Sequence, residues 1–256
     1  AAIVGNMIAN QYATTLNVAL NASTYKIIKG NSDEDTEYFK SDFTSDEERE
    51  SYEAELCAQV EAEGAALLKN DNNALPLASG AKVSLFGHGS VDLMYGGTGS
   101  GSVDTSKAPN FKQALEDQGI QVNSTLWDLY SSDDMMKNYS RITPAAISDT
   151  LEANTQYAVN EAPWSKLSSA ESSFADYGDA AIVVFSRSGG EGADLPSGEN
   201  GTNDSWIKGQ EGDGNYLTLS AEEKELLQNL KTLKDNGTFK KIIVLINSSN
   251  AIEMDF

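Results

Sequence analysis

Four short apolar runs constrain the fold of this chain more than any other feature of its sequence. Each is short, as buried strands are, and they lie at Lys82–Phe86, Ile120–Val122, Asp179–Phe185 and Lys241–Ile246. Stretches with helical signals separate them. Because strands that alternate with helices form mostly parallel sheets with helices on both faces, the pattern predicts an α/β fold, a three-layer α/β/α sandwich. Four strands are few for such a sheet, so we expect the fold to be truncated at its C-terminus.

The helical segments of the sandwich are expected at Asn110–Gln118, Trp127–Asn138, Pro144–Leu151 and Ala221–Lys234. The last of these has the clearest start. Ser220 takes the N-cap position and Glu223 follows three residues later, which is the spacing of a capping box.

The N-terminal part is predicted to be a helical and linker segment. We expect residues 1–45 to form an extension with an acidic linker, and residues 46–256 to form the sandwich domain. Ser45 and Glu48 have the spacing of a second capping box, so a helix of about 22 to 24 residues should start there. Its apolar face is approximated by Tyr52, Leu56, Val60, Ala65 and Leu68.

The first twenty residues are apolar but interrupted by Asn, Gln and Thr. They are too polar for a membrane span of about 20 residues, and they lack the basic region of a signal peptide. Two locations are compatible with this segment. One is the cell surface or the exterior, with an anchor upstream of residue 1, and the other is the cytoplasm.

Charge and rare residues exclude several classes of function. The chain has 18 Lys and Arg against 39 Asp and Glu, a formal net charge of −21, which repels phosphate backbones. We therefore expect no nucleic acid partner. With Cys57 and His88 as its only cysteine and histidine, the chain is not expected to hold zinc.

The third apolar run breaks abruptly into glycines and carboxylates. Gly189, Gly190 and Gly192 surround Glu191, and Asp194 follows. Ligands of parallel sheets gather beyond the carboxyl ends of strands, and a carboxyl between glycines can move to a reacting atom. A general acid at neutral pH also needs a raised pKa, about 6 in a well-studied glycosidase. Other acids compete for this role in the same loop (Asp194, Glu199, Glu211 and Asp213), and a solvated acidic turn is the alternative.

A second glycine-rich segment, Gly96–Gly101, follows the first run. It does not match a dinucleotide fingerprint, because about ten residues separate it from the strand and no helix opens directly after it. We expect a closely approached backbone at the rim of a cleft. His88 follows the same strand and has two interpretations, a ligand contact or a structural residue.

Four segments together resemble glycoside hydrolase family 3, the β-glucosidase family, and specifically its (α/β)6-sandwich domain. They are EGAALLKNDNNALPL (63–77), KVSLFGHGSVDLMYGGTGSGSV (82–103), VVFSRSGGEGADLP (183–196), and LSAEEKELLQNL with KKIIVLINSSNAIEM (219–254). The resemblance implies a retaining hydrolase of β-linked oligosaccharides or glycosides that needs no cofactor. Because few residues precede the sandwich, the chain resembles the minority of members with swapped domain order.

The resemblance also implies roles for single residues. Matching the family's Ser-Gly-Glu-Gly segment makes Glu191 the general acid/base, with Arg187 and Asp194 as neighbours that orient the loop. The nucleophile would lie on a (β/α)8 barrel that is absent here, so this chain alone should be inactive. Substrate contacts would come from His88 or Trp206, which could stack on a sugar ring, and Glu211 is the alternative acid.

Two other functions stay open at this point. The chain could be a non-catalytic carbohydrate-binding or scaffolding module that uses the glycine-rich segment and Trp206, or a nucleotide-binding α/β domain. The sequence leaves the oligomeric state open, including a homo-oligomer.

Overall fold

The structure, a computed structural model, describes residues 2–20, 41–97, 99–101, 103–143, 157–191, 195 and 216–255. It divides into two compact units, Ala1–Leu67 and Leu68–Phe256, which are considered separately. The predicted helix at Pro144–Leu151 lies outside the described residues, as do Asp194, Trp206 and the alternative acid Glu211.

The N-terminal unit contains α1 (Ala2–Gln11), α2 (Ala13–Ala19) and α3 (Asp46–Gly64). None of the helices described in the chain is both long and apolar enough to cross a membrane. Ser45 caps α3 as predicted, since its side chain accepts a hydrogen bond from the Glu48 amide. The other half of the capping box differs by one residue, because the Glu48 carboxylate accepts from the amide and hydroxyl of Thr44.

The predicted length of α3 was wrong. The helix has 19 residues and ends at Gly64, and the next residue, Ala65, has extended backbone with ψ 123°. Ala65 and Leu68 therefore lie beyond the helix, which leaves Tyr52, Leu56 and Val60 as its apolar stripe. All three are exposed.

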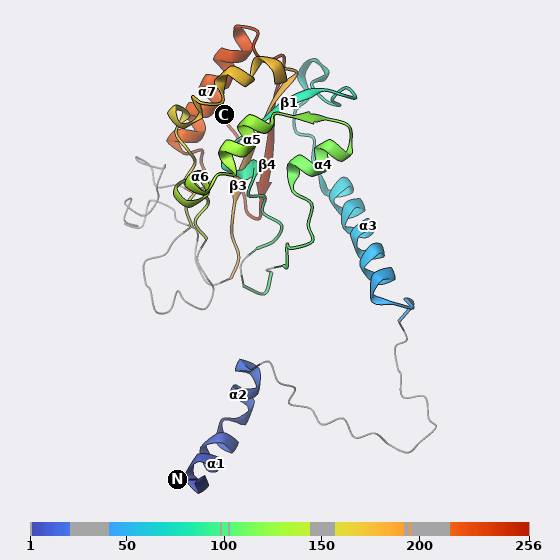
Figure 1. Cartoon of the computed structure of the whole chain (residues 1–256), viewed down its shortest axis with the longest axis vertical. Helices are drawn as coiled ribbons and strands as arrows, with labels where there is room; N and C mark the ends of the chain where they lie inside the picture. Colours follow the sequence, from blue (N-terminus) through green and yellow to red (C-terminus); the bar gives the residue numbers. More distant parts are fainter. Residues whose placement is uncertain are drawn as a thin grey trace. The chain divides into compact units, whose positions relative to one another are not determined.

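The second unit is built on a sheet with the order β2-β1-β3-β4 (Figure 1). The strands are β1 (Lys82–Phe86), β2 (Gln121–Val122), β3 (Ala180–Arg187) and β4 (Ile242–Ser248). All three pairings are parallel, which confirms the predicted sheet. The strand β3 extends two residues beyond the predicted end, because Ser186 and Arg187 still pair with β4.

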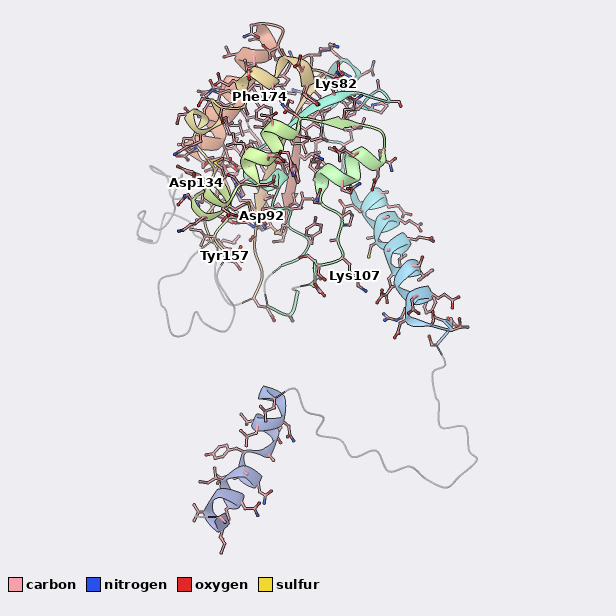
Figure 2. All side chains as sticks on the ribbon, in the orientation of Figure 1. Lys82, Asp92, Lys107, Asp134, Tyr157 and Phe174 are labelled. Carbon is pink, nitrogen blue, oxygen red and sulfur yellow. The ribbon has the colours of Figure 1, made fainter. Side chains whose placement is uncertain are left out.

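Helices cover both faces of the sheet, as a three-layer sandwich requires. Along β3 the side chains alternate. Ala181, Val183 and Phe185 join a core cluster with residues of α5 (Ser124–Tyr130), α6 (Asp133–Asn138) and α7 (Ala221–Asp235). Ala180 and Ile182 belong to a second cluster, against which α4 (Phe111–Asp117) packs. Phe174, labelled in Figure 2, lies in the first cluster and is 1% exposed.

The predicted helix over Trp127–Asn138 is two helices with an earlier start. Asn123 is the N-cap of α5 and accepts a hydrogen bond from the Leu126 amide, so the helix begins before Trp127. Ser132 caps α6 by accepting from the Met135 amide, so the chain restarts a helix there. The predicted cap of α7 is confirmed, with both halves of the Ser220 and Glu223 capping box present.

Candidate active site

Segments that follow β1, β3 and β4 meet at the carboxyl edge of the sheet. The Ser249 hydroxyl donates to the Gly189 carbonyl at 3.2 Å. On the other side, a Cβ added to Gly97 would lie 2.9 Å from the same carbonyl oxygen. The glycine-rich segment after β1 thus packs directly on the segment that carries Glu191, and the contact has no room for a side chain at Gly97.

Glu191 is exposed and held by the glycine-rich segment. Its Oε2 accepts hydrogen bonds from the Ser100 amide at 2.7 Å and from the Ser100 hydroxyl at 2.8 Å. The neighbouring Gly99 has φ +70°, and a Cβ there would overlap the Glu191 carboxylate. Only glycine fits both the backbone angle and the close approach, so Gly99 lets Ser100 reach the carboxylate.

These two hydrogen bonds lower the pKa of Glu191, the Ser100 amide more than its hydroxyl. Both donors bind the ionised form more strongly than the protonated form. The structure therefore favours the carboxylate, which can act as a base. The raised pKa that a general acid needs is not present in this arrangement, because the side chain is exposed rather than buried against apolar surface.

Ser100→Ala is expected to raise the pKa of Glu191, because one of the two donors to Oε2 is removed while the amide stays. The measurement is a titration of the Glu191 side-chain carboxyl carbon by ¹³C NMR on this chain. Ser106→Ala is the matched control, since Ser106 makes the same kind of contact with Asp104 instead. An unchanged Glu191 pKa in Ser100→Ala, or an equal rise in Ser106→Ala, contradicts the assignment.

Arg187, at the end of β3, is fully buried. Its guanidinium donates to both carboxylate oxygens of Glu223 at 2.8 and 2.7 Å, and to the carbonyls of Ser186, Tyr216 and Thr218 at 2.8 to 3.0 Å. With its charge paired and its donors used, Arg187 is placed to hold backbone rather than to bind a ligand.

His88 is also buried, with 3% of its surface exposed. Its backbone amide and its Nδ1 each lie 2.9 Å from the Glu161 Oε2, and the Glu161 Oε1 accepts from the Ala162 amide. Within the described part of the chain, the His88 Nε2 has no hydrogen-bond partner. This burial suits a residue that fixes the segment after β1, and a direct substrate contact stays a prediction.

Sequence reasoning missed Glu161, Tyr216 and Glu223's contact with Arg187. A signal that could have found Glu161 is its place in the mostly apolar sequence YAVNEA (157–162), all of which is buried in the structure. Burial, and to a smaller extent the charge of Glu161, raises the pKa of Tyr130 well above its usual value. Nothing in the sequence pairs Tyr216 with Arg187.

A cavity of about 430 Å³ lies beside this edge, lined mainly by residues 90–97 and also by Ser188. Asp92 and Arg141 form an ion pair on its wall at 3.2 Å. Asn247 fixes the backbone of Met94 by accepting from its amide and donating to its carbonyl. Because residues 90–97 follow β1, which ends at Phe86, the cavity lies beyond the carboxyl end of this strand (Asp92 is labelled in Figure 2). Among the described residues, no cluster of His, Cys, Asp or Glu could hold a metal ion.

The parallel sheet, the helices on both of its faces and the acidic segment beyond β3 are those expected of a glycoside hydrolase sandwich domain. The family described as "Glycosyl hydrolase family 3 C-terminal domain" matches residues 65–256. The chain belongs to this family, as the four sequence segments indicated.

Two similar proteins are β-glucosidases of bacteria. Beta-glucosidase A of Butyrivibrio fibrisolvens is 31% identical over 216 residues, which is 78% of this chain and 23% of that protein. A beta-glucosidase of Ruminococcus albus is 30% identical over 205 residues, or 79% of this chain and 18% of that protein. The chain therefore spans about a fifth of the length of these relatives.

Solved structures agree on the fold. The β-glucosidase of Paenibacillus barengoltzii superimposes with a TM-score of 0.56 at 27% identity, over 78% of this chain and 19% of that one. The β-glucosidase 3B of Thermotoga neapolitana, in complex with glucose, gives 0.56 at 24% identity, over 81% and 26%.

Proposed function

We propose that this chain is part of a retaining β-glycosidase of the β-glucosidase type, and that Glu191 is its general acid/base. The observation that carries the proposal is the placement of the Glu191 carboxylate, exposed beyond β3 and held by Ser100. Membership of the family and the names of the relatives supply the reaction type. In this proposal residues 46–256 are the sandwich domain, and a (β/α)8 barrel elsewhere in the protein supplies the nucleophile.

Retention requires the two carboxyl groups to lie about 5 to 5.5 Å apart. In the first step the nucleophile attacks the anomeric carbon, and protonated Glu191 gives its proton to the leaving oxygen. In the second step the Glu191 carboxylate takes a proton from water, which attacks the same carbon and frees the nucleophile. The geometry around Ser100 suits the second step, since both donors favour the ionised form.

The first step needs the opposite protonation state. A second carboxylate a few ångströms away would raise the Glu191 pKa, because its negative charge disfavours the ionised form of Glu191. The nucleophile on the barrel would supply that charge. The acid and base roles of Glu191 would therefore be set by two groups, Ser100 in this domain and the carboxylate nucleophile on the barrel.

The second candidate is a carbohydrate-binding module without catalysis. The cavity of about 430 Å³ favours it, because that volume falls within the usual range of ligand pockets. This module would bind cellobiose through residues of this chain alone. The third candidate is a nucleotide-binding domain. Titration with cellobiose and with NAD distinguishes it from the carbohydrate-binding module. Binding of NAD alone would contradict both carbohydrate proposals.

The decisive experiment is hydrolysis of p-nitrophenyl β-glucoside by the full-length protein, followed by ¹H NMR. We expect the β-anomer of glucose to appear first and to mutarotate later, because two displacements retain configuration. The 256-residue chain alone should show no turnover, since it lacks the nucleophile. First appearance of the α-anomer contradicts retention. Saturable binding without turnover by the full-length protein supports the binding module instead.

A further inference from the structure

A buried cluster joins the two ends of the segment that carries Glu191. The segment leaves β3 at Arg187 and returns at Tyr216. The Arg187 Nε donates to the Tyr216 carbonyl, 29 residues away, at 2.8 Å. The Ser188 amide donates to the Tyr216 hydroxyl, 28 residues away, also at 2.8 Å. Two hydrogen bonds to Tyr216 therefore link the start of this segment to its end.

Glu223 completes this cluster from the first turn of α7. Its carboxylate binds the guanidinium of Arg187 through both oxygens, and its Oε2 also accepts from the Ser220 amide at 2.9 Å. An N3 glutamate of an ordinary capping box gains little from burial, yet this one is 1% exposed. The paired charge of Arg187 accounts for its burial, because a buried carboxylate must be compensated.

The Tyr216 side chain is held as firmly as its backbone. Its ring lies under the Arg187 guanidinium, 5.6 Å from the centroid, and 5.9 Å from the ring of Tyr157. Burial raises the pKa of Tyr216 to about 12. The hydroxyl stays neutral at any working pH, so its bond to Ser188 is not a pH switch.

We propose that Tyr216 and Glu223 are positioning residues for Glu191, which act through Arg187 and Ser188 on the backbone that carries the carboxylate. The inference rests on the proposed function of Glu191. Successive residues of this backbone have partners on different elements: Arg187 on α7, Ser188 at Tyr216, Gly189 at Ser249. Loss of one of these hydrogen bonds is expected to shift the residues that follow it, including Glu191. A displacement of 1 Å at a reacting group costs about 10²-fold in rate.

The test compares two leaving groups in the full-length enzyme, by kcat/KM, which reports the first chemical step. Cellobiose needs a proton on its leaving oxygen, whereas 2,4-dinitrophenyl β-glucoside does not. Tyr216→Phe and Glu223→Gln are expected to lower kcat/KM for cellobiose about 10- to 100-fold. They should change kcat/KM for the dinitrophenyl glucoside by less than about 2-fold, because this leaving group departs without a proton from the acid.

Tyr216→Phe keeps the aromatic ring in the core and carries the test if Glu223→Gln fails to fold, which thermal melting shows. Tyr130→Phe is the matched control, because Tyr130 is a tyrosine of α5 that is 2% exposed and belongs to the core cluster instead. Equal losses for both substrates, or no loss, overturn the positioning role. If Glu191→Ala itself shows no dependence on the leaving group, the proposed function fails. If Glu191→Ala depends on the leaving group but Tyr216→Phe does not, the positioning role fails and the proposed function of Glu191 stands.

Discussion

Glu191→Ala in the full-length enzyme is expected to lower kcat/KM for cellobiose by about 10²- to 10⁴-fold, the usual contribution of general acid catalysis. The leaving sugar is a poor leaving group without a proton, and no other carboxylate among the described residues is held beyond β3 as Glu191 is. Glu171→Ala is the control, since Glu171 is an exposed glutamate on a 3-10 turn of the same unit. It should keep full activity. An unimpaired Glu191→Ala variant removes Glu191 from the mechanism.

Azide should rescue the Glu191→Ala variant on 2,4-dinitrophenyl β-glucoside. This substrate forms the glycosyl-enzyme without an acid, and the intermediate then accumulates because water lacks its base. Azide needs no deprotonation. It attacks the anomeric carbon, forms a carbon-nitrogen bond and releases the nucleophile carboxylate, giving β-glucosyl azide. Product of the α-configuration, or no azide product, would contradict the assigned base role.

The strands were predictable because their signal is local. The run Lys82–Phe86 gives the same bounds as β1, since a buried parallel strand needs apolar side chains on both faces. Helix ends were less predictable. Asn123 starts α5 earlier than apolar periodicity indicated, and α3 ends at Gly64 although apolar residues continue beyond it. A single polar cap or backbone angle decides such boundaries.

The environment of the candidate site was not predictable in the same way. Glycines on both sides led to the prediction that Glu191 is a mobile carboxylate, but the direction of its pKa shift depends on Ser100, 91 residues away. Likewise His88 was visible in the sequence, whereas its partner Glu161 lies 73 residues further on. Contacts at such separations follow from how β1 and β3 pair, which a residue pattern does not record.

Glu223→Ala is expected to lower the free energy of unfolding of the sandwich unit by about 3 to 5 kcal/mol, the usual cost of leaving one buried charge without its partner. Arg187 is fully buried and would lose both bonds to the carboxylate. Urea unfolding followed by tryptophan fluorescence measures the change. Asp235→Asn is the matched control, because its pair with Lys231 is exposed, and exposed pairs contribute little to stability.

The double variant Arg187→Met with Glu223→Leu separates charge from packing. If the cost of Glu223→Ala comes from an unpaired Arg187, removing both charges should restore part of the lost stability, since apolar replacements of buried pairs are often neutral. The recovery is partial because the three backbone carbonyls that Arg187 binds also lose their donor. Such a variant would still lack the bond from Arg187 to the Tyr216 carbonyl. We therefore expect a stable protein with low activity on cellobiose. This result would separate the contribution of Arg187 and Glu223 to stability from their contribution to the position of Glu191. Full activity in the double variant would show that the ion pair serves stability alone.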